Sequence, residues 1–245
     1  MIKPVVILPS YNSGSQLACT MRAARQFCDD VWAVVDGSTD GSAAEAVAMP
    51  GGGFRAIILE HNCGKGEAVL RGFREAAAAG FTHALVMDAD GQHAAESIPQ
   101  FLELAGRFPD ALVAGVPIFG PDAPPERVKG RKFGNFFASA ETWWLGASDS
   151  LFGFRVYPIG PALRVLEATR SGRRFDFDTV LMVRLLWAGV RAVNLPVPVR
   201  YPPRSEGGVT HFRYIRDNLL LTRVHVRLCL EMFVHIPRLI SLRCR

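Results

Sequence analysis

The feature that most constrains the fold is a regular alternation of apolar, strand-like runs with helical segments over the first half of the chain. The strand candidates are short and rich in Val, Ile and Leu, and they span residues 4–8, 31–36, 55–60, 83–88 and 111–117. The segments between them are rich in Ala, Leu, Arg and Glu, and they span residues 14–28, 41–49, 66–80 and 94–108. Continuous apolar strands separated by helices indicate a parallel sheet covered on both faces. The sequence therefore predicts an α/β sandwich.

Composition is typical of a globular protein in a reducing compartment. Its 245 residues, 49% of them hydrophobic, are enough for one large domain or two small ones with a buried core. The five cysteines are odd in number and include no C-x-x-C pair, so they indicate neither a disulfide framework nor a zinc site. The N-terminus enters a strand-like run at once and shows no secretion signal. We therefore expect a cytoplasmic protein.

The net charge of +5 is concentrated at the C-terminus. Residues 213–245 contain seven arginines against Asp217 and Glu231, and this local excess of five equals the excess of the whole chain. The remainder is close to neutral, which argues against nucleic acid as a partner and indicates a local interaction surface. We therefore expect a main domain over residues 1–212, followed by a basic amphipathic helical segment over residues 213–245.

The C-terminal segment has two interpretations. Residues 214–242 are dense in apolar side chains, but charged residues interrupt every run, so no transmembrane helix of about 20 apolar residues is expected. A basic amphipathic helix in the membrane interface would bring the protein to the inner face of an anionic bilayer. Alternatively, the segment is a terminal helix packed on the main domain, or a dimer contact.

Polar clusters follow four successive strand candidates, at the edge of a parallel sheet where ligands collect. They are residues 9–12, 36–41, 62–66 and 88–93. Tyr11 offers an aromatic face for a nucleotide base, Asp36 can accept a hydrogen bond from a base or ribose, and Lys65 is a cation for phosphate. Each cluster alone is also compatible with a simple turn, and Ser38 or Asp40 with a helix cap.

The fourth cluster, Asp88-Ala89-Asp90-Gly91-Gln92-His93, predicts a divalent-cation site. Two carboxylates two residues apart can bend toward one hard cation that keeps water or phosphate oxygens as its other ligands, as Mg²⁺ and Mn²⁺ do on phosphorylated substrates. The alternative is a polar turn that closes a strand. The three clusters upstream favour the metal.

As an ordered set, the four clusters resemble the motifs of glycosyltransferase family 2, and most closely its dolichol-phosphate mannosyltransferase branch. The resemblance spans about residues 3–212, and it continues in residues 149–155, an Asp followed by Gly-Phe-Arg, and in residues 204–211. Two positions depart from the pattern. Val35 stands where the second motif usually has an acid, and Phe152 replaces the small polar residue usual before Gly-Phe-Arg.

The resemblance implies a GT-A fold, with a mostly parallel sheet sandwiched by helices. It also implies an inverting transferase that uses a nucleotide-diphosphate sugar together with Mg²⁺ or Mn²⁺. Carried over position by position, Pro9, Tyr11 and Asp36 would hold the nucleoside. Asn12 and Ser38, which belong to the same two motifs, are further candidates for donor binding.

The departing nucleoside diphosphate needs stabilisation, because breaking the sugar–phosphate bond builds negative charge on it. A cation that bridges both phosphates provides this without a proton donor. The resemblance implies that Asp88, Asp90 and Gln92 serve the metal and the diphosphate, and we expect Asp90 to be essential for turnover. Arg204 or His211 would close over the diphosphate from the later loop.

The acceptor decides whether a general base is needed. An alcohol must lose a proton as it attacks, and Asp149 or Asp178 would then be the base. A lipid phosphate is already an anion and needs cations to position it. Residues 126–132 carry four positive charges, Arg131 among them, and Arg155 is expected to join them. The alternatives are an exposed basic helix start for residues 126–132, and a helix N-terminal carboxylate for Asp178.

Other functions fit the motifs less well. A haloacid-dehalogenase-type phosphohydrolase places its Asp-x-Asp after the first strand, whereas here it follows the fourth. A P-loop ATPase and a Rossmann dehydrogenase lack their glycine patterns in this sequence. A nucleotide-sugar or membrane-binding module without turnover remains the non-enzymatic alternative.

Overall fold

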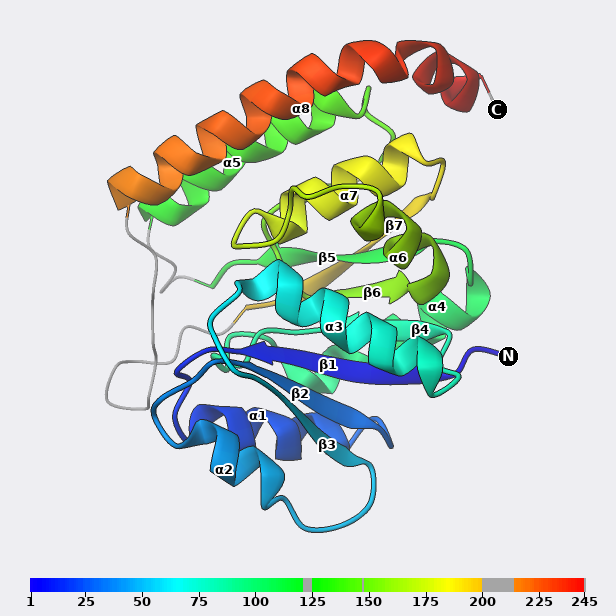
Figure 1. The fold of residues 1–245 in the computed structure, drawn as a ribbon. Coiled ribbons are helices and arrows are strands. Elements are labelled where there is room, and N and C mark those ends of the chain that lie inside the picture. Colours follow the sequence, from blue (N-terminus) through cyan, green and yellow to red (C-terminus); the bar gives the residue numbers. More distant parts are fainter. Residues whose placement is uncertain (121–124, 147, 200–213, 245) are drawn as a thin grey trace.

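The computed structural model describes residues 1–120, 125–146, 148–199 and 214–244, with the side chains of 125–129 and 214–218 excepted. Its centre is a seven-stranded sheet in the order β3-β2-β1-β4-β6-β5-β7 (Figure 1). The strands are β1 (Pro4–Ser10), β2 (Val31–Asp36), β3 (Phe54–Leu59), β4 (His83–Val86), β5 (Leu112–Ile118), β6 (Arg155–Pro158) and β7 (Ala192–Pro198). All neighbouring pairs are parallel except the two that β6 makes, with β4 and β5.

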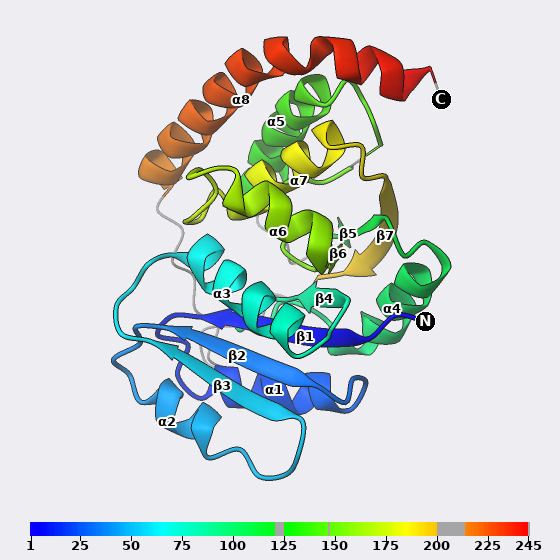
Figure 2. The same cartoon turned by 45° about the vertical axis from the view of Figure 1, so that its right-hand side comes forward.

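Helices cover both faces of the sheet, as the continuous apolar strands predict (Figure 2). On β1, Val5 and Ile7 face one core while Val6 and Leu8 face the other, because successive side chains of a strand point to opposite faces. One face packs on α1 (Gln16–Arg25), α2 (Ser42–Val47), the short η1 (Ala95–Ser97) and α4 (Ile98–Arg107). The other packs on α3 (Lys65–Ala78), α6 (Ile159–Glu167) and α7 (Phe177–Trp187). The predicted α/β sandwich is confirmed.

Two long helices form a further layer outside α7. They are α5 (Pro125–Glu141) and α8 (Tyr214–Arg243), which lie side by side at the top of Figure 1. Leu228 and Leu239 of α8 are buried against the main core, and His225 Nδ1 lies 2.9 Å from Glu141 Oε1 of α5. The C-terminal segment is therefore helical and packs on the main domain. Among the described residues, no helix has the length and apolarity needed to cross a membrane.

Two strands, β6 and β7, were not predicted from the sequence. The four-residue β6 begins with Arg155. An arginine is normally expected at the surface, but this one is buried in the sheet. The β7 strand contains Pro196 and Pro198, and proline is normally evidence against a strand. Proline is tolerated here because β7 is the last strand of the sheet, where one side needs no backbone donors.

Candidate active site

The loops that follow β1 and β2 are hydrogen-bonded into one unit. The backbone N–H of Asn12 donates to Ser38 Oγ at 3.0 Å, and Asn12 Oδ1 accepts from the Thr39 N–H at 2.8 Å. Asp40 accepts from the Gly14 N–H and also from the N–H and hydroxyl of Ser42 at the start of α2. Asn12 and Ser38 thus join the two loops that are predicted to bind the nucleoside. The N-cap residue of α2 is Gly41, and Asp40 contacts the helix one position earlier, through Ser42.

Beside this unit, Tyr11 is 43% exposed while Pro9 is buried at the end of β1. Asp36 is almost completely buried, and its two oxygens accept from the backbone N–H groups of Cys63 and Gly64, each at 2.7 Å. The carboxylate therefore ties the loop after β3 to the end of β2. Val35, at the position where the related motif has an acid, is a fully buried core residue.

The loop after β4 brings the predicted metal ligands to the carboxyl end of that strand. Its turn is closed by the Gln92 N–H, which donates to Asp90 Oδ1 at 3.0 Å, and by Gly91, whose φ is +75°. Burial, together with the nearby negative charge of Asp88, raises the pKa of Asp90 to about 6. A cation bound between the two carboxylates would relieve this repulsion, so the electrostatics of the loop suit a divalent metal.

His93, the last residue of the same loop, packs against two phenylalanines and accepts a hydrogen bond within the loop. Its ring stacks on Phe154 at 4.9 Å between centroids and meets the edge of Phe152 at 4.8 Å. Burial lowers the pKa of His93 to about 4, so the ring is neutral near pH 7. Its Nδ1 accepts from the Asp88 N–H at 3.0 Å, which places the ring hydrogen on Nε2. Phe152, which stands in place of the small residue usual in the motif, thus packs against the histidine of the loop after β4.

Lys65, the first residue of α3, joins two carboxylates that are far apart in sequence. Its Nζ lies 2.6 Å from Asp88 Oδ1 and 2.7 Å from Asp178 Oδ2. Burial opposes the charge, but the carboxylates of Asp178 and Asp88 outweigh it and raise the pKa of Lys65. The predicted phosphate cation is therefore paired with two aspartates, and Asp178, the first-turn carboxylate of α7, belongs to the same cluster as Asp88.

Gly153 leaves room for this cluster. A Cβ atom at position 153 would lie 2.7 Å from Lys65 Nζ, 3.0 Å from Asp88 Oδ2 and 3.4 Å from Asp178 Oδ1. The glycine of the Gly-Phe-Arg motif is thus required because three charged atoms converge where a side chain would begin. Asp178 Oδ1 is buried and has no hydrogen-bond partner among the residues that the structure describes.

Arg155 does not join the basic residues expected to hold an acceptor phosphate, and that prediction is wrong. The side chain is fully buried, and it donates to the backbone oxygens of Asp178 at 2.5 Å and Asp149 at 3.0 Å. A guanidinium enclosed in this way cannot reach a ligand at the surface. It instead fastens the start of α7 to the loop that precedes β6.

Asp149 is the anchor of α5. Its buried carboxylate accepts from Arg131 Nη1 at 2.7 Å, from Asn135 Nδ2 at 2.9 Å and from the backbone N–H groups of Leu151 and Phe152. Four donors on two oxygens favour a positioning role over proton abstraction. Arg131 is held at the edge of the site with 21% of its side chain exposed. Arg204 and His211 lie outside the described residues.

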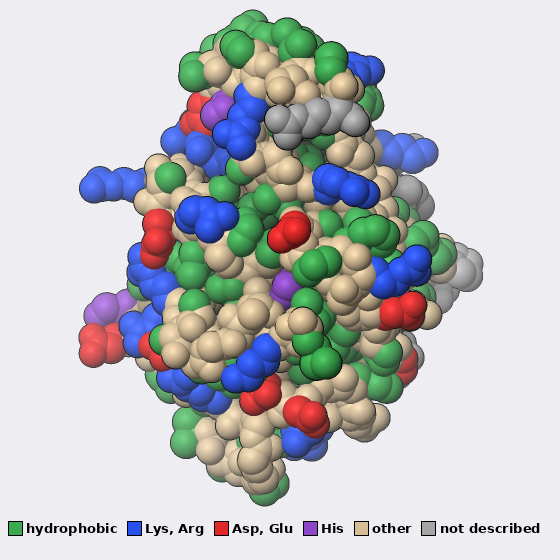
Figure 3. Space-filling view, turned by 90° about the vertical axis from the view of Figure 1, so that its right-hand side faces the viewer, with side chains coloured by type: hydrophobic (Ala, Val, Ile, Leu, Met, Phe, Trp, Pro, Cys, Tyr) green, Lys and Arg blue, Asp and Glu red, His purple; other side chains and the backbone are tan. Residues whose placement is uncertain are grey.

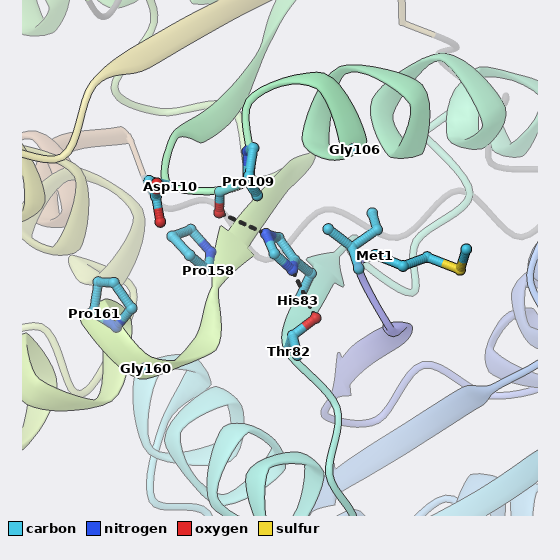
Figure 4. Close-up of a pocket in the computed structure, with 10 residues that line it drawn as sticks. Met1, Thr82, His83, Gly106, Pro109, Asp110, Pro158, Gly160 and Pro161 are labelled. Atoms are coloured by element: carbon cyan, nitrogen blue, oxygen red, sulfur yellow. Dashed lines mark hydrogen bonds between the residues drawn. The ribbon is translucent and has the colours of Figure 1, made fainter.

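A separate pocket of about 340 Å³ lies at the opposite end of the sheet, near the starts of β1 and β4 (Figure 4). Its His83 has both ring nitrogens engaged, with Thr82 Oγ1 at 2.9 Å and Pro109 O at 2.8 Å. Residues of the four predicted clusters do not line it. It therefore stands apart from the site at the carboxyl ends of the strands.

Comparisons with known proteins identify the family of the chain. Residues 5–162 match the family described as Glycosyl transferase family 2. Undecaprenyl-phosphate mannosyltransferase of Micrococcus luteus is 27% identical over 213 residues, which are 80% of this chain and 83% of that protein. Polyprenol monophosphomannose synthase of Mycolicibacterium smegmatis is 25% identical over 203 residues, 80% of this chain and 76% of that protein.

Solved structures show the same fold. Glucosyl-3-phosphoglycerate synthase from Mycobacterium tuberculosis, solved with Mn²⁺, UDP-glucose and phosphoglyceric acid, superposes with a TM-score of 0.66 at 17% identity, covering 94% of this chain and 79% of that one. Its complex with Mn²⁺, UDP and glucosyl-3-phosphoglycerate gives 0.63 at 18% identity, covering 94% and 80%. The fold is of the GT-A type, as the sequence motifs imply. Because the family match covers more than half of the chain, this protein belongs to glycosyl transferase family 2 and is a glycosyltransferase.

Proposed function

We propose that this enzyme transfers a sugar from a nucleotide-diphosphate donor to a polyprenyl phosphate, with inversion at the anomeric carbon and with Mg²⁺ or Mn²⁺ bound at the loop after β4. The observation that carries the proposal is the pair Asp88 and Asp90 at the carboxyl end of β4, where burial and mutual repulsion raise the pKa of Asp90 to about 6. The two relatives reported above are named as an undecaprenyl-phosphate mannosyltransferase and a polyprenol monophosphomannose synthase, which supports the acceptor class.

The metal would be held by oxygen ligands of the protein and of the donor. Asp90, Asp88 and the Gln92 amide offer the hard oxygen donors that Mg²⁺ and Mn²⁺ prefer. The described residues contain no group of three or more His, Cys, Asp or Glu arranged to hold a metal ion. Oxygens of the donor's diphosphate would therefore complete the coordination of the cation. When bound, the cation would stabilise the charge of the departing diphosphate.

On the donor side, the unit formed by the first two loops would hold the nucleoside. Tyr11 is exposed next to the hydrogen bonds that join Asn12 to Ser38 and Thr39, so its ring is available for a base to stack on. Asp36 would act mainly through the Cys63 and Gly64 amides, by keeping the third loop next to this unit.

On the acceptor side, Arg131, whose side chain is 21% exposed, is our candidate for the cation that binds the acceptor. An anionic acceptor needs such a charge and no general base, which agrees with the engagement of Asp149 by four donors and of Asp178 by Lys65. We predict that Arg131→Gln raises the KM for lipid phosphate about tenfold and changes the KM for the donor little. Steady-state kinetics test this prediction. The matched control is Lys132→Gln, which removes the charge of an exposed neighbour. An equal rise in both KM values would contradict the assignment.

The C-terminal helix would place the enzyme on the membrane that carries the acceptor. Leu219, Val226, Leu230 and Phe233 of α8 are exposed at helical spacing, and Phe233 is 64% exposed. Hydrophobic side chains gather at the top of Figure 3, the level at which α8 lies in Figure 1. Arginines at 223, 227, 238 and 243 lie on the same helix. An exposed apolar strip with basic neighbours suits an anionic bilayer surface.

The strip gives a direct test of membrane binding. We predict that Phe233→Glu lowers the fraction of protein that floats with phosphatidylglycerol vesicles about fivefold or more, because it places a negative charge where the bilayer would be. Ser241→Glu, which adds the same charge at an exposed polar position of α8, should change flotation much less. If Phe233→Glu floats as well as the wild type, the strip is a protein contact instead.

Turnover is tested with a panel of nucleotide-diphosphate sugars, undecaprenyl phosphate and Mn²⁺ or Mg²⁺. We expect one donor to give a lipid-linked sugar and an equal amount of nucleoside diphosphate. Saturable donor binding without release of nucleoside diphosphate would instead indicate the binding module without turnover.

A further inference from the structure

The cluster around Lys65 contains more negative charge than the metal loop alone. Asp88, Asp90 and Asp178 contribute three carboxylates, and Lys65 is the cation that bridges two of them, at 2.6 and 2.7 Å. The charge of the buried Arg155 also acts on Asp88 and Asp178, but its described hydrogen bonds go to backbone oxygens and to Tyr157, so Lys65 is the cation in direct contact with these carboxylates. His93 is neutral, because burial lowers its pKa to about 4.

The fold fixes Lys65 between its two partners. Gly66, the next residue of α3, packs so tightly on the loop before α7 that a Cβ would lie 1.9 Å from the backbone oxygen of Gly172. The Glu67 N–H donates across the same contact to the Arg173 oxygen at 3.0 Å. This contact brings the start of α3 to Asp178, so the position of the ammonium is set by backbone packing.

We infer that Lys65 is a positioning residue that acts as an internal counter-ion. Its ammonium pairs with the Asp88 carboxylate, and this pairing makes the binding of a divalent cation depend on the donor. The inference rests on the proposed metal site. With Lys65 in place, one oxygen of Asp88 is engaged and part of the negative charge that would attract a cation is already neutralised. The diphosphate then supplies the missing negative charge and oxygen ligands, so metal and donor bind together. Asp178 shares the ammonium and so weakens its hold on Asp88.

This arrangement predicts opposite effects for two substitutions on Mn²⁺ binding without nucleotide. Lys65→Met should tighten Mn²⁺ binding about fivefold or more, because it frees Asp88 and removes a positive charge close to the site. Asp178→Asn should weaken Mn²⁺ binding, because the ammonium then interacts with Asp88 alone. A merely structural role for Lys65 would weaken binding in both variants.

The experiment is a titration of each folded, full-length variant with Mn²⁺, followed by the loss of the free Mn²⁺ signal in electron paramagnetic resonance. Lys3→Met removes the same charge at the opposite edge of the sheet and serves as the matched control. The rise in Tm caused by Mn²⁺, measured in parallel, should be larger for Lys65→Met than for the wild type, since a ligand that binds the native state stabilises it.

Two outcomes would overturn the inference. One is Mn²⁺ affinity in Lys65→Met that equals or falls below that of the wild type, and the other is a change of the same sign in Lys65→Met and Asp178→Asn. A different result would contradict the proposed metal site itself. That result is the absence of Mn²⁺ binding by the wild type in the presence of every common nucleoside diphosphate. The two failures are therefore distinguishable.

Discussion

Replacing Asp90 with asparagine should abolish sugar transfer and at the same time make the unliganded protein more stable at neutral pH. Transfer should fall about a hundredfold or more, because the substitution removes the carboxylate expected to hold the cation against the leaving diphosphate. The gain in stability follows from the environment of Asp90. Burial and the charge of Asp88 disfavour its ionised form and raise its pKa to about 6.

The sign of the pH dependence follows from the same shift. The folded protein holds the Asp90 proton more tightly than the unfolded chain, where the pKa is near 3.8. The cost of ionising Asp90 is therefore absent below pH 3.8, grows as the pH rises toward about 6, and is fully present above that. An asparagine side chain carries no charge, so the difference in Tm between Asp90→Asn and the wild type should be positive near pH 7.5 and should shrink toward zero near pH 4.

Thermal melting without metal at the two pH values, together with the transfer assay, tests this prediction. Asp29→Asn is the matched control, because that carboxylate is exposed and its ion pair with Arg25 at the surface contributes little. The control should keep its activity and its Tm. Loss of activity in Asp90→Asn accompanied by a lower Tm near pH 7.5 would mean that Asp90 supports the fold and does not serve a ligand.

Gly66→Ala should unfold the protein more readily, whereas the same change in most helices is stabilising. A Cβ at position 66 would lie 1.9 Å from the backbone oxygen of Gly172 and 2.8 Å from Arg173 Cα, and neither atom can move without shifting the loop before α7. We expect a loss of about 3 kcal/mol in the free energy of unfolding. In a chain of this size, that corresponds to a fall in Tm of roughly 6–12 °C.

A matched change elsewhere should have the opposite sign. Gly106 lies within α4, and a Cβ there meets no atom within 4 Å. Gly106→Ala should therefore raise stability by about 0.5–1 kcal/mol, since alanine loses less conformational entropy in a helix. Equal Tm values for the two variants would contradict the close contact between α3 and the loop before α7, and with it the fixed position of Lys65.

The first half of the fold could be predicted because its local patterns agree with its tertiary environment. The predicted strand at residues 31–36 is β2 to the residue, and the predicted helix at 66–80 overlaps α3 almost completely. These segments are buried on both faces or amphipathic, so their hydrophobic pattern reports their structure directly. The strands of the second half could not be predicted from a hydrophobic pattern, because β6 contains a buried arginine and β7 contains two prolines.

The sequence predicted which loops form the candidate site but did not show how the charges in it are paired. The Asp88 to His93 loop was recognisable from two carboxylates behind an apolar strand. Lys65 looked like a phosphate ligand because its neighbour Asp178 is 113 positions away in the sequence. Arg155 looked like a surface cation for the same reason, since its partners are backbone oxygens that only the folded chain brings near. Long-range pairing of polar groups leaves no periodic signal in a sequence.

The most direct test of the account is Mn²⁺ binding by the wild type and by Asp90→Asn in the presence of saturating nucleoside diphosphate, followed by electron paramagnetic resonance. We expect the wild type to lower the free Mn²⁺ signal in proportion to the protein added, by more than the nucleotide alone does, and we expect Asp90→Asn to leave most of that signal in place. Equal Mn²⁺ binding by the two proteins would show that the loop after β4 does not hold the cation.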